Sequence, residues 1–153
     1  MAYNRVVGRG INEYKKSNII MVLNMIFLVI ALLGCQPVSM VEYYSQKDNY
    51  VDASGTVSHL YDDVENRTLY IGFADLTPSF DDTNFKIAGN NYDIIMGNGI
   101  MEELKIGVNV KFVSAPLYFG DGYVMPIASI TIGHKPFLDF ETGFANILTL
   151  YTS

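Results

Sequence analysis

The chain is poor in cysteine: among its 153 residues, only Cys35 carries a thiol. The residues that follow Cys35 therefore cannot form a disulfide with one another. A domain without cysteine is compatible with any redox compartment, including an oxidising exterior, where a free thiol would be a liability. The length of the chain is typical of one domain.

Cations are also scarce after Cys35. From that residue onward, six Lys or Arg face fifteen Asp or Glu, a net charge of −9, whereas residues 1–34 hold four cations and one acid, a net charge of +3. An acidic body repels phosphate backbones, from which nucleic-acid-binding proteins gain most of their affinity. The sequence therefore argues against nucleic acid as a partner, and against adsorption of the body to anionic lipid.

Recognisable catalytic and metal-binding motifs are missing from the sequence. There are two histidines, His59 and His134, and no Gly-x-Ser-x-Gly elbow that would expose a nucleophilic serine. Two acidic groups could offer oxygens to calcium, but neither has the spacing of a calcium-binding loop: Asp62, Asp63 and Glu65, and Asp75, Asp81 and Asp82. The sequence thus predicts no catalytic residue, no metal and no cofactor, and we expect a protein that is not an enzyme.

One long apolar run is present, over residues 19–34, where Asn24 is the only strongly polar residue. A basic flank precedes the run, and Leu32-Leu33-Gly34-Cys35 ends it, which is the layout of a secretory signal. These four residues resemble the lipobox of bacterial lipoproteins. The resemblance implies that the Cys35 thiol is lipidated and that Cys35 becomes the new N-terminus. Acyl chains would then hold the body at the membrane surface.

Two other interpretations of the run stay open. A single-span anchor needs about 20 apolar residues, and this run has 16. A buried core helix with an incidental cysteine is the third possibility. The first two agree that residues 36–153 lie outside the cytoplasm, attached to the cell membrane through the Cys35 lipid or through residues 19–35. We therefore divide the chain into a head with signal or anchor at 1–35, a tether at 36–49, and a folded domain at 50–153.

The pattern of the folded domain is mainly that of β-strands. Residues 50–61 alternate, with Val51, Ala53, Gly55, Val57 and His59 on one face. A polar turn at 62–66 and a second alternating run at 67–73 complete a hairpin. Gly55 and Gly72 suggest bends or bulges in these two strands. Further strands are expected at 85–89, from Gly107 to 113, and at 124–132.

Two helical regions are expected between and after these strands. Residues 90–98 place Tyr92, Ile95 and Met96 at helical spacing, with Asn98-Gly99 as a stop and a second turn at 100–104. Residues 137–151 form an amphipathic helix, whose apolar positions are Phe144, Ile147, Leu148 and Tyr151.

The order of three strands, a helix, two strands and a tail helix resembles the OB-fold, a five-stranded Greek-key barrel with a helix between strands three and four. The stretch "LKIGVNVKF" is similar to the usual entry to the fourth OB strand. Residues 50–132 as a whole resemble the small OB-fold (tRNA-anti-like) lipoproteins and membrane-anchored proteins of Gram-positive bacteria. The resemblance implies the fold but no single ligand, because OB-folds bind oligonucleotides, sugars, peptides and proteins.

The stretch "APLYFGDGYVMP", residues 115–126, has the strongest binding character. In an OB-fold this loop borders the usual binding face, opposite the loop after strand one, here 61–67. Tyrosine offers a large, stiff contact area with one polar tip. We expect an aromatic platform for a sugar or a peptide, or else rings that pack on the tail helix; the candidate ligand-binding residues are Tyr118, Phe119, Asp121, Tyr123 and Tyr61.

These observations together predict a membrane-tethered, extracytoplasmic OB-like module that binds an envelope protein or polysaccharide. Two alternatives remain. The first is a nucleic-acid-binding OB domain, which the family resemblance favours and the charge opposes. The second is an envelope enzyme whose site has no recognisable motif.

Overall fold

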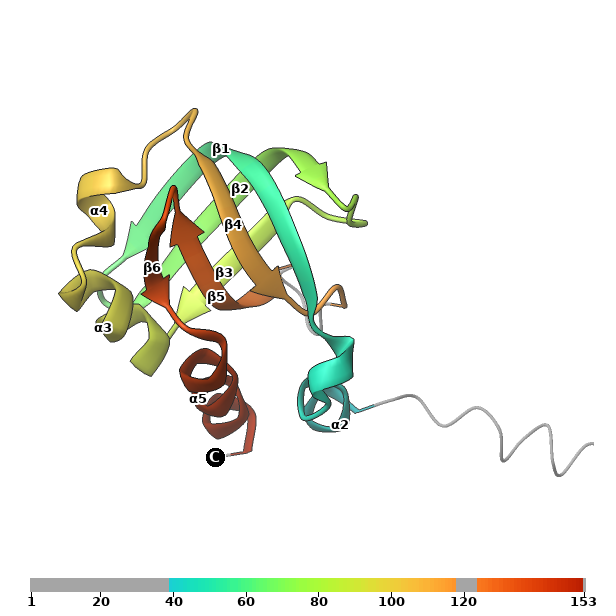
Figure 1. The fold of residues 1–153 in the computed structure, drawn as a ribbon. Helices are drawn as coiled ribbons and strands as arrows, with labels where there is room; N and C mark the ends of the chain where they lie inside the picture. The colour runs from blue at the N-terminus through green and yellow to red at the C-terminus, as the bar shows by residue number, and fades with distance from the viewer. Residues whose placement is uncertain (1–38, 118–123, 153) are drawn as a thin grey trace, which may run out of the picture. The chain divides into compact units, whose positions relative to one another are not determined.

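A computed structural model describes residues 39–117 and 124–152 of the chain. The strands are β1 (Val51–Asp63), β2 (Thr68–Thr77), β3 (Asn84–Ala88), β4 (Asn109–Ser114), β5 (Met125–Ile132) and β6 (Lys135–Leu138). The helices are α2 (Met40–Tyr44), the 3-10 helix η1 (Lys47–Asn49), α3 (Asn90–Gly97), α4 (Ile100–Glu103) and α5 (Phe140–Thr152) (Figure 1). The apolar run and Cys35 lie outside the described residues. Within the described ranges, no helix has the length and apolarity needed to cross a membrane.

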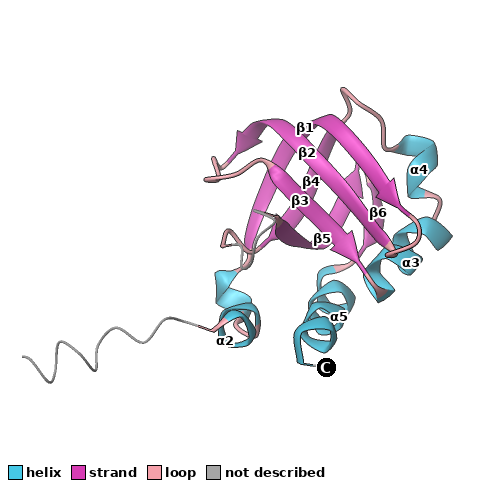
Figure 2. Ribbon diagram, turned by 180° about the vertical axis from the view of Figure 1, so that it is seen from behind, coloured by secondary structure: helices cyan, strands magenta, loops and turns pink. Residues whose placement is uncertain are grey.

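The six strands form one sheet in the order β3-β2-β1-β4-β5-β6, with antiparallel neighbours throughout. In addition, β3 pairs with β5 in parallel, through Phe85 opposite Met125 and Lys86 opposite Pro126. The sheet bends strongly, as Figure 2 shows from behind. The expectation of a mainly β domain that ends in a helix is confirmed, and α3 and α4 lie between β3 and β4 as predicted.

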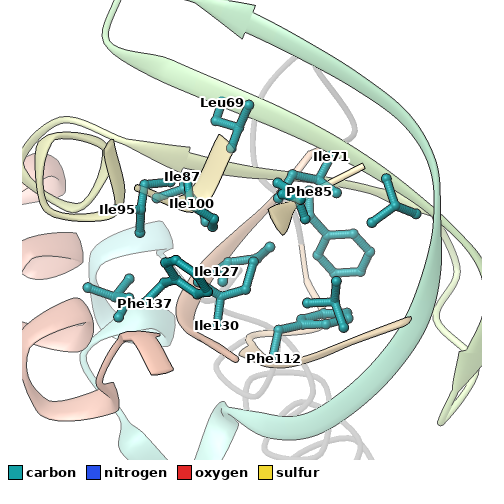
Figure 3. Packing of buried hydrophobic residues seen from close by; sticks show 14 of the residues in the cluster. Leu69, Ile71, Phe85, Ile87, Ile95, Ile100, Phe112, Ile127, Ile130 and Phe137 are labelled. Carbon is teal, nitrogen blue, oxygen red and sulfur yellow. The ribbon is translucent and has the colours of Figure 1, made fainter. Parts of the chain in front are cut away.

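The hydrophobic core lies inside the bent sheet. Leu69, Ile71 and Phe73, the predicted inward face of β2, are each at most 2 % exposed. Side chains of α3 and α4 reach the same core, as Figure 3 shows for Ile95 and Ile100. Burying an aliphatic or aromatic side chain of this size contributes roughly 1.5–3 kcal/mol, so the packed sheet faces account for most of the stability.

A bulge in β1 corrects one sequence prediction. The alternation of buried residues holds from Ala53 to Val57, but His59, predicted on the same face, is exposed. The pairing with β2 shifts by one residue between Val57 and His59. A bulge inserts one extra residue into a strand and so reverses which side chains face outward. As a result, His59 and Tyr61 lie on the outer face of the sheet.

The sixth strand corrects a second prediction. Residues 137–138 were expected to begin the tail helix, but β6 pairs with β5 there, and α5 begins at Phe140. Two consecutive side chains, Phe137 and Leu138, are buried, so the helical period does not extend to them. The helix starts after Asp139, whose carboxylate accepts a hydrogen bond from the Thr142 amide (3.0 Å), as an N-cap residue does.

Part of the segment predicted as a tether is folded. In α2, Tyr44 is 1 % exposed, and its ring stacks on that of Tyr151 in α5, with 5.0 Å between centroids. The Tyr44 hydroxyl donates to the Leu117 carbonyl (2.9 Å), and Lys47 of η1 pairs with Glu141 of α5. Residues 39–49 are therefore packed against the body through α5.

Candidate functional site

Of the residues predicted to bind a ligand, the structure describes one. Tyr118, Phe119, Asp121 and Tyr123 lie outside the described residues, as does the predicted lipidation site Cys35. Tyr61 is described: it lies near the end of β1 and is 63 % exposed.

Tyr61 is one half of an exposed tyrosine pair. It lies directly opposite Tyr70 of β2, and the two rings stack with 6.0 Å between centroids and 29° between planes. Aromatic residues at opposed positions of neighbouring strands stabilise a sheet by roughly 0.2–1 kcal/mol. That gain does not explain why the Tyr61 ring is left mostly in water. The pair instead offers a flat aromatic area on the outside of the sheet.

His59 lies on the same outer face, and its position depends on a glycine. His59 is opposite Gly72, and a Cβ atom on Gly72 would come within 1.8 Å of the imidazole ring. The ring therefore lies directly over the backbone of β2. This contact explains why a residue without a side chain stands in the middle of a β-strand, where glycine is otherwise unfavourable.

A chain of hydrogen bonds fixes the orientation of the imidazole. The Asn84 amide Nδ2 donates to Asp82 Oδ1 (2.9 Å), so that Asn84 Oδ1 faces His59 Nε2 (3.0 Å). An amide oxygen can only accept, so His59 Nε2 donates to it. The Ser58 hydroxyl oxygen lies 3.1 Å from Nδ1. The outer face thus holds the imidazole in one orientation.

Lys86 extends the same row of residues. It lies opposite Tyr70 on β3 and is half-buried, and none of the three ion pairs between described residues includes it. Burial lowers its pKa, because a charged ammonium is less stable away from water. We call this surface the tyrosine face and define it by the residues His59, Tyr61, Tyr70, Asn84 and Lys86.

A hollow of about 480 Å³ lies on another part of the sheet, over β1, β4 and β5. Two rows of opposed residues cross it: Asp52, Val113 and Ser129, and Ser54, Lys111 and Thr131. Neither Asp52 nor Lys111 takes part in the ion pairs found between described residues. This hollow, which we call the hydroxyl groove, is wide open, and six of its nine lining residues are polar.

The outer face also places a serine beside its imidazole. Such a pair is part of the pattern of an activated nucleophile, and Ser58 and His59 are both exposed on the outer sheet face. Neither residue lines the hydroxyl groove, so that hollow does not shield them from water. Across residues 39–117 and 124–152, no group of three or more His, Cys, Asp or Glu side chains could hold a metal ion.

Sequence reasoning found Tyr61 and missed the rest of the tyrosine face. Tyr70 is nine positions away in sequence and Asn84 is a further fourteen, and strand pairing alone brings them together. The predicted turn at 62–66 is centred on residue 64 and would place Tyr61 opposite Arg67. In the structure the turn is centred between residues 65 and 66, and Tyr61 lies opposite Tyr70. The bulge that turns His59 outward had a signal in the sequence: the register shifts opposite Gly72 and around Gly55, the two glycines that suggested bends or bulges.

Comparison with known proteins gives no match to a family model, to a curated protein or to a solved structure. The resemblance to OB-fold lipoproteins therefore stays a prediction, and function has to be argued from the two surfaces.

Proposed function

We propose that the protein is a membrane-tethered, extracytoplasmic OB-like domain that binds a polysaccharide of the cell envelope on its tyrosine face. The observation that carries this proposal is the exposed stack of Tyr61 on Tyr70 beside the oriented His59 imidazole. The apolar face of a sugar ring packs on an aromatic ring, while neighbouring amide and imidazole groups bond its hydroxyls. Exposed aromatic area of this kind marks interaction surfaces.

The OB assignment is supported by strand order. With the β3–β5 pairing, the sequence of neighbours is β1-β2-β3-β5-β4 and back to β1, and helices lie between β3 and β4. This order of neighbours is the one expected of an OB-type barrel, with β6 as an addition at the edge. In OB-folds, the face of strands two and three binds oligosaccharides and oligonucleotides, and three residues of the tyrosine face lie on β2 and β3. Backbone nuclear Overhauser contacts between Phe85 and Met125 would test the closure.

The charge of the body favours a sugar polymer without strong charge. Three acids lie at or close to the β1–β2 turn. Asp62 accepts a hydrogen bond from Tyr92, Asp93 accepts one from Arg67, and Glu65 is exposed on the turn itself. An anionic polymer would approach against these acids, with Lys86 as the only cation of the tyrosine face. A neutral polysaccharide meets no such repulsion, and its binding should depend little on salt.

The test is a binding assay with the full-length protein and a neutral cell-wall polysaccharide from a Gram-positive host. We expect Tyr61→Ala and Tyr70→Ala each to weaken binding about tenfold, or about 1.4 kcal/mol, because each removes half of the aromatic platform. Tyr61→Phe, which keeps the ring, should bind almost as the parent does. Lys111→Ala in the hydroxyl groove is the matched control and should change nothing.

Two results would count against the proposal. The first is polysaccharide binding that survives both alanine substitutions in folded protein. The second is an absence of polysaccharide binding together with tight, salt-sensitive binding of single-stranded oligonucleotides, which would favour the nucleic-acid alternative.

The tether has its own test: intact mass of the membrane-extracted protein should correspond to a chain that starts at Cys35 and carries a diacylglyceryl group.

A further inference from the structure

Two exposed apolar side chains lie on segments that meet at the end of the body where α2 lies. Val41 of α2 is 38 % exposed, and Leu117 is 47 % exposed. The two segments meet at Tyr44 of α2, whose hydroxyl donates to the Leu117 carbonyl. We call this surface the α2 end and define it by Val41 and Leu117.

The length of chain before α2 limits how far the α2 end can be from an anchor at Cys35. Residues 36–38 separate Cys35 from Ser39, whose side chain caps α2 by accepting from the Glu42 amide (3.1 Å). Four Cα-to-Cα steps span at most about 14 Å. A body tied at Cys35 therefore cannot swing away from the membrane, because the predicted tether is largely taken up by folded structure.

We propose that the α2 end rests on the surface of the phospholipid bilayer. This inference rests on the proposed tether but not on the proposed ligand. Apolar side chains that are exposed in water gain from entering the interface, and tyrosines are enriched at that depth. Half-buried Tyr43 also belongs to α2. The lipid would then cover apolar side chains of the α2 end that the rest of the body leaves exposed to water.

The contact is apolar rather than electrostatic. Glu42 is exposed in α2, and Lys47 is already paired with Glu141, so these residues give the α2 end no excess of positive charge for anionic headgroups. Shielding by salt should therefore leave the contact intact. This distinguishes it from the usual attachment of basic surfaces to anionic membranes.

The contact would also set the direction in which the body presents its other end. Figures 1 and 2 show α2 and α5 at one end of the body and the connection from α4 to β4 at the other. Ile106, in that connection, is 70 % exposed. With the α2 end on the lipid, this connection faces away from the membrane. Ile106 thus serves as a matched position for a control.

The experiment uses the lack of tryptophan in the chain. A single tryptophan is introduced into the full-length protein as Val41→Trp, Leu117→Trp or Ile106→Trp, and each variant is reconstituted through its own anchor into phosphatidylcholine vesicles with brominated acyl chains. We expect strong quenching of the first two tryptophans by the bromine atoms, at low and at high salt, and no quenching of the third. Circular dichroism confirms that each variant is folded.

Each other outcome overturns the proposal in a distinguishable way. Variants that float with the vesicles but show no quenching at Val41→Trp and Leu117→Trp would leave the tether standing and refute the lipid contact. Equal quenching at all three positions would mean that the body has no preferred orientation. Quenching that salt abolishes would mean that charge, rather than apolar contact, holds the body. Protein that does not float with the vesicles would refute the tether itself, and the lipid contact with it.

Discussion

Replacing Gly143 by alanine should destabilise the fold, against the usual trend for helices. Alanine is favoured over glycine in a helix by about 1 kcal/mol. Gly143, however, lies where α5 crosses β5, and a Cβ atom there would come within 1.9 Å of the Ala128 carbonyl oxygen. The obstacle is backbone, which cannot turn aside as a side chain can. The helix must therefore move away from the strand by about 1.5 Å to restore an ordinary contact.

The magnitude follows from what this movement breaks. Inserting an extra methyl group into a packed contact costs about 1–3 kcal/mol. The Gly143 carbonyl also accepts a hydrogen bond from buried Asn91 (2.9 Å), and weakening it costs about 1 kcal/mol more. After the gain in helix propensity is subtracted, Gly143→Ala should lower the free energy of unfolding by about 1–3 kcal/mol.

The assay is equilibrium unfolding in urea, followed by circular dichroism and compared between two variants. Gly97→Ala is the matched control, because Gly97 is exposed at the end of α3 and a Cβ there meets nothing within 4 Å. That variant should gain about 0.5 kcal/mol. If Gly143→Ala proves as stable as the parent, or more so, α5 does not cross β5 at the distance described here.

Two further predictions concern buried polar groups. Asn91 is 1 % exposed, donates to the Gly143 carbonyl and accepts from Asn146 (2.8 Å). Asn91→Ala should therefore lower the free energy of unfolding by about 1–3 kcal/mol, measured by unfolding in urea. A variant as stable as the parent would contradict this prediction. Burial raises the pKa values of Tyr44, Tyr50 and Tyr151 above their ordinary range. The contribution of these three tyrosines to stability is therefore complete below about pH 10 and is lost as the pH rises further. The urea concentration at the unfolding midpoint should fall above that pH, and it should fall less steeply with pH in Tyr44→Phe.

The local elements were largely predictable because the signals lie within a few residues. Alternation placed Leu69, Ile71 and Phe73 on the inward face of β2, and all three are buried. The pair Asn98-Gly99 predicted the end of α3, where Asn98 is the C-cap and Gly99 has a φ of +76°. Such signals act through the conformational preferences of single residues and the period of a strand or helix.

The misses arose where a contact distant in sequence decided the outcome. Residues 135–138 carry too few alternations to predict a strand, yet β6 forms because β5 offers its edge to a segment that returns through a turn at Gly133. Residues 39–49 have no clear period beyond a helical stretch expected around 40–44, which α2 confirms. That this segment packs on the body was not expected, and it does so because Tyr44 stacks on Tyr151 near the other end of the described chain. In both cases the stabilising partner is tertiary.

The sequence by itself determined the chemistry available to this protein: an acidic body without cysteine, strands whose apolar residues alternate, and a basic, apolar head that ends in Leu-Leu-Gly-Cys. These features follow from composition and short-range spacing, which need no folded chain. Only the tertiary structure decided which side chains share a surface. A single bulge at Ser58 turned His59 and Tyr61 outward, and strand pairing set them beside Tyr70, Asn84 and Lys86. The register of a sheet depends on the whole set of strand contacts, so no local pattern could have placed that face.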